Sequence, residues 1–156
     1  MKPRVYIETT VISYLTAPPS RDLLVAAHQQ VTQSWWSQRD RFALFVSQAV
    51  LREARQGDAA LAARRLTALH GIQVLQLTSD AGNLATRLIE QSALPEKAAA
   101  DAIHIAVAVV NGMDFLLTWN CAHIANAATR GRIDRVCREA GFEPAVICTP
   151  EELDEE

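Results

Sequence analysis

The 156-residue sequence contains no long hydrophobic run, and this absence excludes a class of protein. A helix that crosses a bilayer needs about 18 or more consecutive apolar residues, and no stretch here approaches that length. Even the apolar stretch Ala98–Val110 is too short, and it carries Asp101 and His104. The first residues lead directly into a strand-like segment, without the features of a secretory signal peptide. We therefore expect a soluble, cytoplasmic protein.

Cysteine is also scarce. The three cysteines, Cys121, Cys137 and Cys148, are an odd number at wide spacing. They form no C-x-x-C pair, which argues against a zinc knuckle or a thioredoxin-type redox motif. Free thiols in a reducing compartment are the expected state.

Charge is sparse as well, at 21% of residues, and the net charge of −3 argues against a broad basic surface for nucleic acid. Five acids stand in residues 151–156, so the rest of the chain carries a small positive net charge. No internal repeat, low-complexity tract or linker rich in Pro, Gly or Ser divides the chain. We expect one domain over residues 1–150, followed by an acidic tail over residues 151–156 that is frayed and solvated.

Short apolar runs alternate with longer helical patterns along the chain. Strands are expected at Val5–Ile7, Phe42–Val46, Ile72–Leu77, Phe115–Thr118 and Ala145–Cys148. We expect a short helical turn at 15–19. We expect helices over 20–38, 48–55, 59–69, 79–92, Pro95–Val110 and 133–140. This alternation predicts an α/β fold with three layers, in which a parallel sheet of about five strands is flanked by helices on both faces. In such sheets, functional groups gather beyond the carboxyl ends of the strands.

Asp101 is the most informative acid of the chain. It lies in the first turn of the helix around Ala98–Val110, which is otherwise almost free of charge. An unpaired buried carboxylate is costly, so Asp101 needs a partner. The helix leads into a short apolar strand that ends at Thr118 and Asn120, which places oxygen ligands at the helix start and just past the strand.

Two further acids stand near strand ends. Glu8 directly follows the first strand, and Glu53 lies on a helix after the second. Glu8 alone can equally be the N-cap of the next helix, and Glu53 alone can pair with Arg52 or Arg55 on the surface. Two carboxylates about 4 Å apart repel by about 4 kcal/mol at an effective dielectric near 20, which a cation or a proton relieves. Hard oxygen ligands select Mg²⁺ or Mn²⁺, which activate water and neutralise charge on a phosphoryl oxygen.

These motifs, taken in order, resemble a known family. The chain has an acid–Thr pair after the first strand, Glu53 six residues after Ser47, an Ala-Asp-Ala-x-His motif at Asp101, and a strand that ends Leu-Leu-Thr-x-Asn. From Val5 to about Pro150 this order resembles the PIN domains, and most closely the VapC-type toxin ribonucleases of toxin–antitoxin pairs.

The resemblance implies a PIN-like fold and an Mg²⁺- or Mn²⁺-dependent ribonuclease that cleaves RNA, binds a cognate antitoxin and forms a homodimer. The family's acidic positions map onto Glu8, Glu53, Asp101 and Asn120. By this resemblance Glu8, Asp101 and Asn120 hold the metal directly or through water. Glu53 binds a second, transient metal or positions the attacking water.

Two positions depart from the family pattern. The first acid is usually Asp and is Glu8 here, so the extra methylene displaces the carboxylate. The fourth is often Asp and is Asn120 here, which lowers the negative charge of the site by one and disfavours a second tightly held metal. A non-catalytic PIN-like module that binds RNA or protein is therefore the alternative. A phosphatase or phosphotransfer domain needs a nucleophilic Asp after the first strand, and Glu8 fits that role poorly.

Several neighbouring side chains are candidates for supporting roles. Thr9 and Thr118 are expected to orient carboxylates or a water through their hydroxyls. His104 lies three residues after Asp101 on the same helix face, and because Mg²⁺ disfavours imidazole we expect it behind the ligands or in the core.

His123 and Asn126 follow Asn120 at helical spacing and are candidates to line the site, with Asn126 favoured. Trp35 and Trp36 are expected in the core or an interface rather than stacked on RNA bases. The densest basic cluster can either follow RNA phosphates or form a solvated helix face. It comprises Arg130, Arg132, Arg135 and Arg138.

Overall fold

The structure is a computed structural model that describes residues 1–154. Five strands form one sheet in the order β3-β2-β1-β4-β5, and every neighbouring pair is parallel. The strands are β1 Arg4–Ile7, β2 Ala43–Ser47, β3 Gln73–Leu75, β4 Phe115–Leu117 and β5 Val146–Cys148. The predicted parallel sheet of about five strands is confirmed, and the predicted strand ends differ from these by at most two residues.

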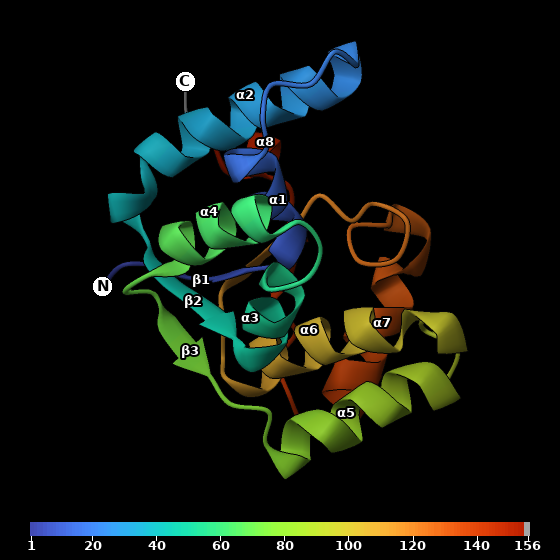
Figure 1. Ribbon diagram of the computed structural model, residues 1–156. Helices are drawn as coiled ribbons and strands as arrows, with labels where there is room; N and C mark the ends of the chain where they lie inside the picture. Colours follow the sequence, from blue (N-terminus) through green and yellow to red (C-terminus); the bar gives the residue numbers. More distant parts are fainter. Residues whose placement is uncertain (155–156) are drawn as a thin grey trace.

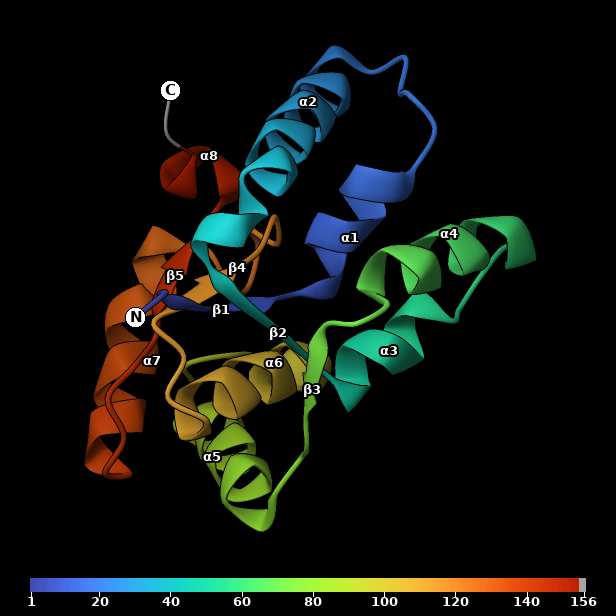
Figure 2. The same ribbon diagram turned by 90° about the vertical axis from the view of Figure 1, so that its left-hand side faces the viewer.

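Helices cover both faces of the sheet. Figures 1 and 2 show α1, α2 and α4 on one side and α5, α6 and α7 on the other. The α-helices are α1 Thr9–Thr16, α2 Leu23–Ser37, α3 Gln48–Ala54, α4 Ala59–Leu69, α5 Ser79–Glu90, α6 Ala99–Val110, α7 Ala127–Glu139 and α8 Pro150–Leu153. Two short 3₁₀ turns, η1 Arg39–Arg41 and η2 Glu96–Ala98, precede β2 and α6.

The starts of the first two helices differ from the prediction because of their capping groups. Of the helical turn expected at 15–19, only residues 15 and 16 are helical, and they end α1, which begins directly after Glu8. The helix expected over 20–38 begins at Leu23, because Asp22 is its N-cap and accepts from the backbone N of Val25 at 3.0 Å. Ser20 accepts a hydrogen bond from the backbone N of Asp22.

The expectation of a frayed acidic tail is wrong for residues 151–153. Together with Pro150 these residues form α8, which begins with a capping box between Thr149 and Glu152. Leu153 packs against the hydrophobic core, and α8 lies beside α2 (Figure 2). The last two residues of the predicted tail, 155 and 156, lie outside the described residues.

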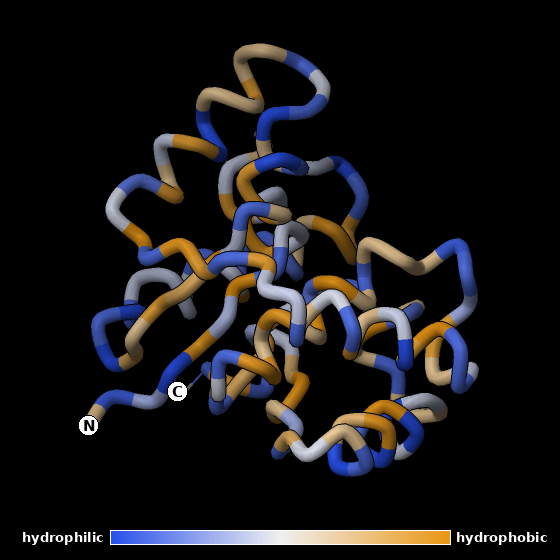
Figure 3. The backbone as a smooth tube through the Cα atoms, turned by 90° about the horizontal axis from the view of Figure 1, so that it is seen from below, coloured by the Kyte–Doolittle hydropathy of each residue, from blue (hydrophilic) through white to orange (hydrophobic). Residues whose placement is uncertain are grey.

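The core follows the hydropathy of the sequence. In Figure 3 the helices alternate between hydrophobic and hydrophilic residues along their length, as expected for helices that cover a sheet. α6 is the exception, because it is buried on almost every side and packs against α5. The burial of α6 explains why this helix contains so few charged residues. Within residues 1–154, no helix is long and apolar enough to cross a membrane.

Candidate active site

The order of the strands places one edge of the sheet at a topological switch point. The chain runs from β1 outward to β2 and β3, and then returns to the other side of β1 as β4 and β5. The carboxyl ends of β1 and β4 therefore border the crevice in which open α/β sheets bind their ligands. Glu8 follows β1, and Thr118 and Asn120 follow β4.

Glu8 is held between α1 and β4. Glu8 is 3% exposed and is the N-cap of α1, so the capping alternative is also correct. One oxygen, Oε2, accepts from the backbone N of Thr10 at 3.0 Å. The other, Oε1, accepts from the hydroxyls of Thr10 and Thr118, each at 2.5 Å. The helix start and the end of β4 are thereby joined through one carboxylate.

Glu53, on α3, is bonded to the interior rather than to the arginines beside it. The partners of Glu53 are the Thr9 hydroxyl at 2.7 Å and the His104 Nε2 at 2.5 Å, not Arg52 or Arg55. Both partners contact the same oxygen, Oε1. Burial by itself raises the pKa of Glu53, but the hydrogen bonds from His104 and Thr9 outweigh it and the pKa is lowered.

Asp101 is clamped by two residues that follow β4. The side-chain amide of Asn120 donates to Oδ1 of Asp101 at 3.0 Å, and Nδ1 of His123 is 3.0 Å from Oδ2. The backbone N of His123 donates to Oδ1 of Asn120 at 3.1 Å, which fixes the orientation of the amide. Asn120 therefore presents its NH₂ group, a donor, to Asp101.

Hydroxyl groups connect these acids to one another. The Thr118 hydroxyl, which donates to Glu8, accepts from the backbone N of Asn120 at 2.9 Å. A continuous path of hydrogen bonds thus runs from Glu8 through Thr118 and Asn120 to Asp101. Thr9, next to Glu8 in the chain, makes the link to Glu53.

The structure brings His123 to the site and gives Asn126 a different task. Asn126 is the N-cap of α7, where Oδ1 accepts from the backbone N of Ala128 at 2.9 Å and Nδ2 donates to the Ala122 carbonyl at 3.1 Å. Residues 121–125 form turns rather than a helix, so the helical spacing used in the sequence argument does not apply. The signal that was missed is that Asn before a helix is a strong capping residue.

The basic cluster lies on α7. Arg132, Arg135 and Arg138 are exposed, and Arg130 is half-buried. Arg132 and Arg135 line a cavity of about 250 Å³ with Gln91 and Ser92 of the α5–α6 connection. Arg138 pairs with Glu143 at 3.3 Å. Among residues 1–154, none of these arginines bonds to Glu8, Glu53 or Asp101.

The three tryptophans are buried or half-buried, and Trp119 is next to the site. Trp35 is fully buried in the core, and Trp36 is half-buried beneath the guanidinium of Arg39. Trp119 stacks on His28 of α2 with ring centroids 4.1 Å apart. Trp119 lies between Thr118 and Asn120, so this contact ties the end of β4 to α2.

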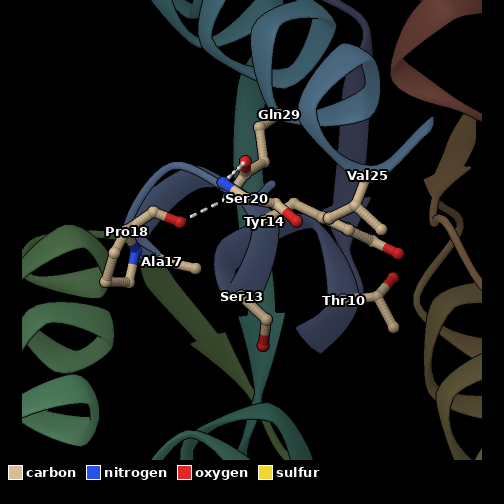
Figure 4. A pocket seen from close by; sticks show the side chains of 8 residues that line it. All are labelled: Thr10, Ser13, Tyr14, Ala17, Pro18, Ser20, Val25 and Gln29. Carbon is tan, nitrogen blue, oxygen red and sulfur yellow. Dashed lines mark hydrogen bonds between the residues drawn. The ribbon is translucent and has the colours of Figure 1, made fainter. Parts of the chain in front are cut away.

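A groove adjoins the site between α1 and the start of α2 (Figure 4). Its volume is about 520 Å³, and Thr10, which binds Glu8, is one of its walls. Gln29 closes the far end by bonding the backbone N of Ser20 at 2.9 Å and the Pro18 carbonyl at 3.1 Å. The remaining lining residues are Ser13, Tyr14, Ala17 and Val25.

The site offers carboxylate, hydroxyl and amide oxygens, which are the type of ligand that a hard cation prefers. Within the described residues, no group of three or more His, Cys, Asp or Glu side chains is placed to hold a metal ion. Mg²⁺, however, is usually held by one or two carboxylates, with water and substrate phosphates as the other ligands. Oε2 of Glu53 has no protein partner among the described residues and is available for such a role.

Comparison with known proteins bears on the fold. No protein-family model matches the sequence, and no curated protein sequence matches it. Among solved structures, VapC20 of Mycobacterium tuberculosis, described as a sarcin-ricin loop cleaving toxin, superposes with a TM-score of 0.60 over 78% of this chain and 93% of that chain. This chain has the VapC fold. The PIN-like architecture implied by the sequence resemblance is confirmed.

A second structure supports the same fold. VapBC2 of Rickettsia felis, bound to a DNA fragment from its promoter, superposes with a TM-score of 0.55 over 94% of this chain and 98% of that chain. The sequence identities are 19% for VapC20 and 12% for VapBC2. At such low identities these structures show only that the fold is shared. The activity has to be inferred from the residues of the site.

Proposed function

We propose that this protein is a metal-dependent endoribonuclease that hydrolyses RNA phosphodiester bonds, and that it is the toxin of a type II toxin–antitoxin pair. The observation that carries the proposal is the position of Glu8, Glu53 and Asp101 around the carboxyl ends of β1 and β4, at the switch point of a VapC fold. Their link through Thr9, Thr118 and Asn120 makes them one site.

The residues would divide the work as follows. Glu8, Asp101 and Asn120 would hold Mg²⁺ or Mn²⁺, directly or through water. The bound ion would activate water and neutralise charge on the phosphoryl oxygens. Glu53, ionised because its pKa is lowered, would hold the attacking water with its free oxygen, Oε2. Thr118 would keep Glu8 in place as RNA enters.

Replacement of Asp101 tests the activity. Purified wild-type protein should cleave total RNA with Mn²⁺ or Mg²⁺ and stop when EDTA is added. Asp101→Asn should lower the rate by more than about 100-fold, because it removes a proposed ligand rather than a residue that only supports one. Asp80→Asn, an exposed position on α5, is the matched control and should cleave like wild type. Cleavage by Asp101→Asn in a preparation free of other nucleases would refute the proposal.

A non-catalytic module that binds RNA or protein is the second candidate. It is favoured by the neutral Asn120 and by the donors that already occupy both oxygens of Asp101. Titration with Mn²⁺ separates the two candidates. An enzyme should bind Mn²⁺ and bind it more weakly after Glu8→Gln or Asp101→Asn, whereas a module should bind its partner without binding the metal.

We also propose a cognate antitoxin and a homodimer as partners. VapBC2 was solved on a fragment of its own promoter, which supports the toxin–antitoxin part of the proposal. An antitoxin would insert an Arg or Lys side chain among the carboxylates. Coexpression with the neighbouring reading frame should suppress RNA cleavage and yield a copurifying complex. Light scattering of the purified protein alone should give the mass of two copies of this chain. Unchanged cleavage after coexpression would contradict the antitoxin proposal.

Arg130, Arg132 and Arg135 of α7 are proposed to contact RNA phosphates. Replacing Arg132 or Arg135 by Gln should weaken RNA binding for all sequences alike and reduce the dependence of binding on salt. An unchanged salt dependence would leave the cluster as a solvated helix face.

A further inference from the structure

A chain of buried polar groups leads from the middle of the sheet to Glu53. The Tyr6 hydroxyl, on β1, lies 2.7 Å from the Ser47 hydroxyl and 2.7 Å from Nδ1 of His104. The other ring nitrogen of His104, Nε2, contacts Oε1 of Glu53 at 2.5 Å. Tyr6 and His104 are at most 1% exposed. Such groups are costly in a core unless each of them is hydrogen-bonded, and here each is.

For a neutral His104 ring, the direction of these hydrogen bonds follows from their two ends. The backbone N of Val50 donates to the Ser47 hydroxyl, and the ionised Glu53 can only accept. With a proton on Nε2 of His104 facing Glu53, Nδ1 is left to accept from Tyr6. Tyr6 in turn accepts from Ser47. Burial raises the pKa of Tyr6, so its hydroxyl keeps the proton that this arrangement needs.

The chain ends on one oxygen of Glu53. His104 and Thr9 both bond Oε1, while Oε2 has no partner among the described residues. The side chain of Glu53 is 34% exposed, whereas that of His104 is 1% exposed. One oxygen is therefore fixed from the inside, and the other is presented to the site.

We propose that Tyr6 and His104 are positioning residues that hold Glu53 with Oε2 aimed at the reacting water. Tyr6 fixes the His104 ring through Nδ1, and the proton on Nε2 of His104 fixes Oε1 of Glu53. This inference rests on the proposed RNA hydrolysis. A hydrogen bond to Nδ1 that fixes the ring and its tautomer is a recurrent way to orient an imidazole.

A histidine that is merely satisfied in the core is the competing explanation, and substitutions of graded chemistry distinguish the two. His104→Leu fills the space without a donor, whereas His104→Gln keeps one donor and one acceptor. Tyr6→Phe removes only the hydroxyl. Ile147→Val, a mild change at a buried position of β5, is the control for a loosened core.

Nitrogen-15 NMR of the imidazole tests the arrangement without RNA. Wild-type protein should show a proton on Nε2 of His104, and Tyr6→Phe should shift the Nδ1 resonance of that ring, because Nδ1 loses its hydrogen bond. Ile147→Val should leave both ring resonances unchanged. A ring without a proton on Nε2, or an Nδ1 resonance that Tyr6→Phe does not shift, would overturn the proposal.

Steady-state kinetics on an RNA substrate test the consequence. His104→Leu and Tyr6→Phe should lower kcat by about 10- to 100-fold, the range for residues that orient a catalytic group. KM should stay within about threefold, because substrate binding is untouched. His104→Gln should recover most of kcat, and Ile147→Val should match wild type. Wild-type kcat in folded His104→Leu, or no recovery in folded His104→Gln, would overturn the proposal.

These experiments distinguish a failure of the proposed RNA hydrolysis from a failure of the positioning role. If the wild-type protein cleaves no RNA with either metal, the proposed function fails, and the NMR result alone decides whether Tyr6 and His104 fix Glu53. If wild type cleaves and folded His104→Leu cleaves equally well, only the positioning role fails. Thermal unfolding of each variant, compared with Ile147→Val, identifies a variant that fails to fold.

Discussion

At the scale of single residues, short hydroxyl side chains determine where the acids lie. Glu8 is almost fully buried, and two threonine hydroxyls and one backbone N–H provide its hydrogen bonds. Thr118 is central, since it donates to Glu8 and accepts from the backbone of Asn120. Its loss would leave a buried carboxylate and a backbone N–H each short of one bond.

Thr118→Val should therefore destabilise the fold. The expected loss is about 1–3 kcal/mol of unfolding free energy, the range for a buried polar group left without its partner. Thr118→Ser keeps the hydroxyl and removes one methyl, which should cost only about 1 kcal/mol. Urea unfolding of both variants measures the difference. Equal losses for Val and Ser would show that the methyl group, not the hydroxyl, stabilises this position.

The lowered pKa of Glu53 predicts a dependence of stability on pH. A carboxyl whose pKa is lowered in the folded state stabilises the fold above its ordinary value of 4.5, and this contribution is lost as the pH falls through the folded pKa. The unfolding free energy of wild type should therefore drop more steeply below about pH 4.5 than that of Glu53→Gln. Urea unfolding between pH 7 and pH 3, with EDTA present, measures both curves. Parallel curves would contradict the assigned hydrogen bonds.

At the scale of elements, capping groups decide where the helices around the site begin. Glu8, Ser47 and Asn126 end a strand or turn and cap the helix that follows. Helix α7 shows the effect most clearly, because the sequence pattern placed its start at 133 and the cap places it at Ala127. The observed helix therefore starts six residues earlier than predicted, and Arg130 and Arg132 belong to it.

Asn126 should act on stability through this cap. Asn126→Ala should lower the unfolding free energy by about 1 kcal/mol, whereas Asn126→Asp, which can also cap, should change it little. Chemical denaturation followed by circular dichroism measures both. A variant Asn126→Ala with wild-type stability and impaired RNA cleavage would instead place Asn126 in the site, as the helical spacing suggested.

At the scale of the whole molecule, the sheet determines which thiols solvent reaches. Cys121 is exposed, whereas Cys137 on α7 and Cys148 on β5 are buried. Burial raises the pKa of Cys137 to about 11 and that of Cys148 to about 12. The thiolate is the reactive form of cysteine. Both buried thiols should therefore react slowly, because solvent does not reach them and because the raised pKa keeps them protonated.

The reaction of the cysteines with a thiol reagent should therefore report whether the protein is folded. At pH 8 one cysteine should react rapidly in native protein, and two should react only as the chain unfolds. Cys121→Ser should abolish the fast reaction and leave the slow one. The slow rate should rise with urea in parallel with global unfolding. Three fast thiols in native protein would contradict the packing of β5 and α7.

The sequence by itself determined the order of elements, the parallel sheet and the acids that stand at its edge. Periodic apolar runs and strand-to-helix alternation are local signals, and they are strong for α6 and for β1 because burial leaves few polar residues in these elements. Glu8, Asp101 and Asn120 were found because they directly follow or precede such apolar segments.

Only the tertiary structure decided which groups these acids contact. Glu53 bonds His104, 51 positions away, and Thr118 bonds Glu8, 110 positions away. Asp101 is met by His123 rather than by Asn126, because residues 121–125 turn instead of continuing a helix. Local patterns specify the face on which a side chain lies, whereas its partner depends on how distant elements pack. That packing turns three separate acids into one connected site.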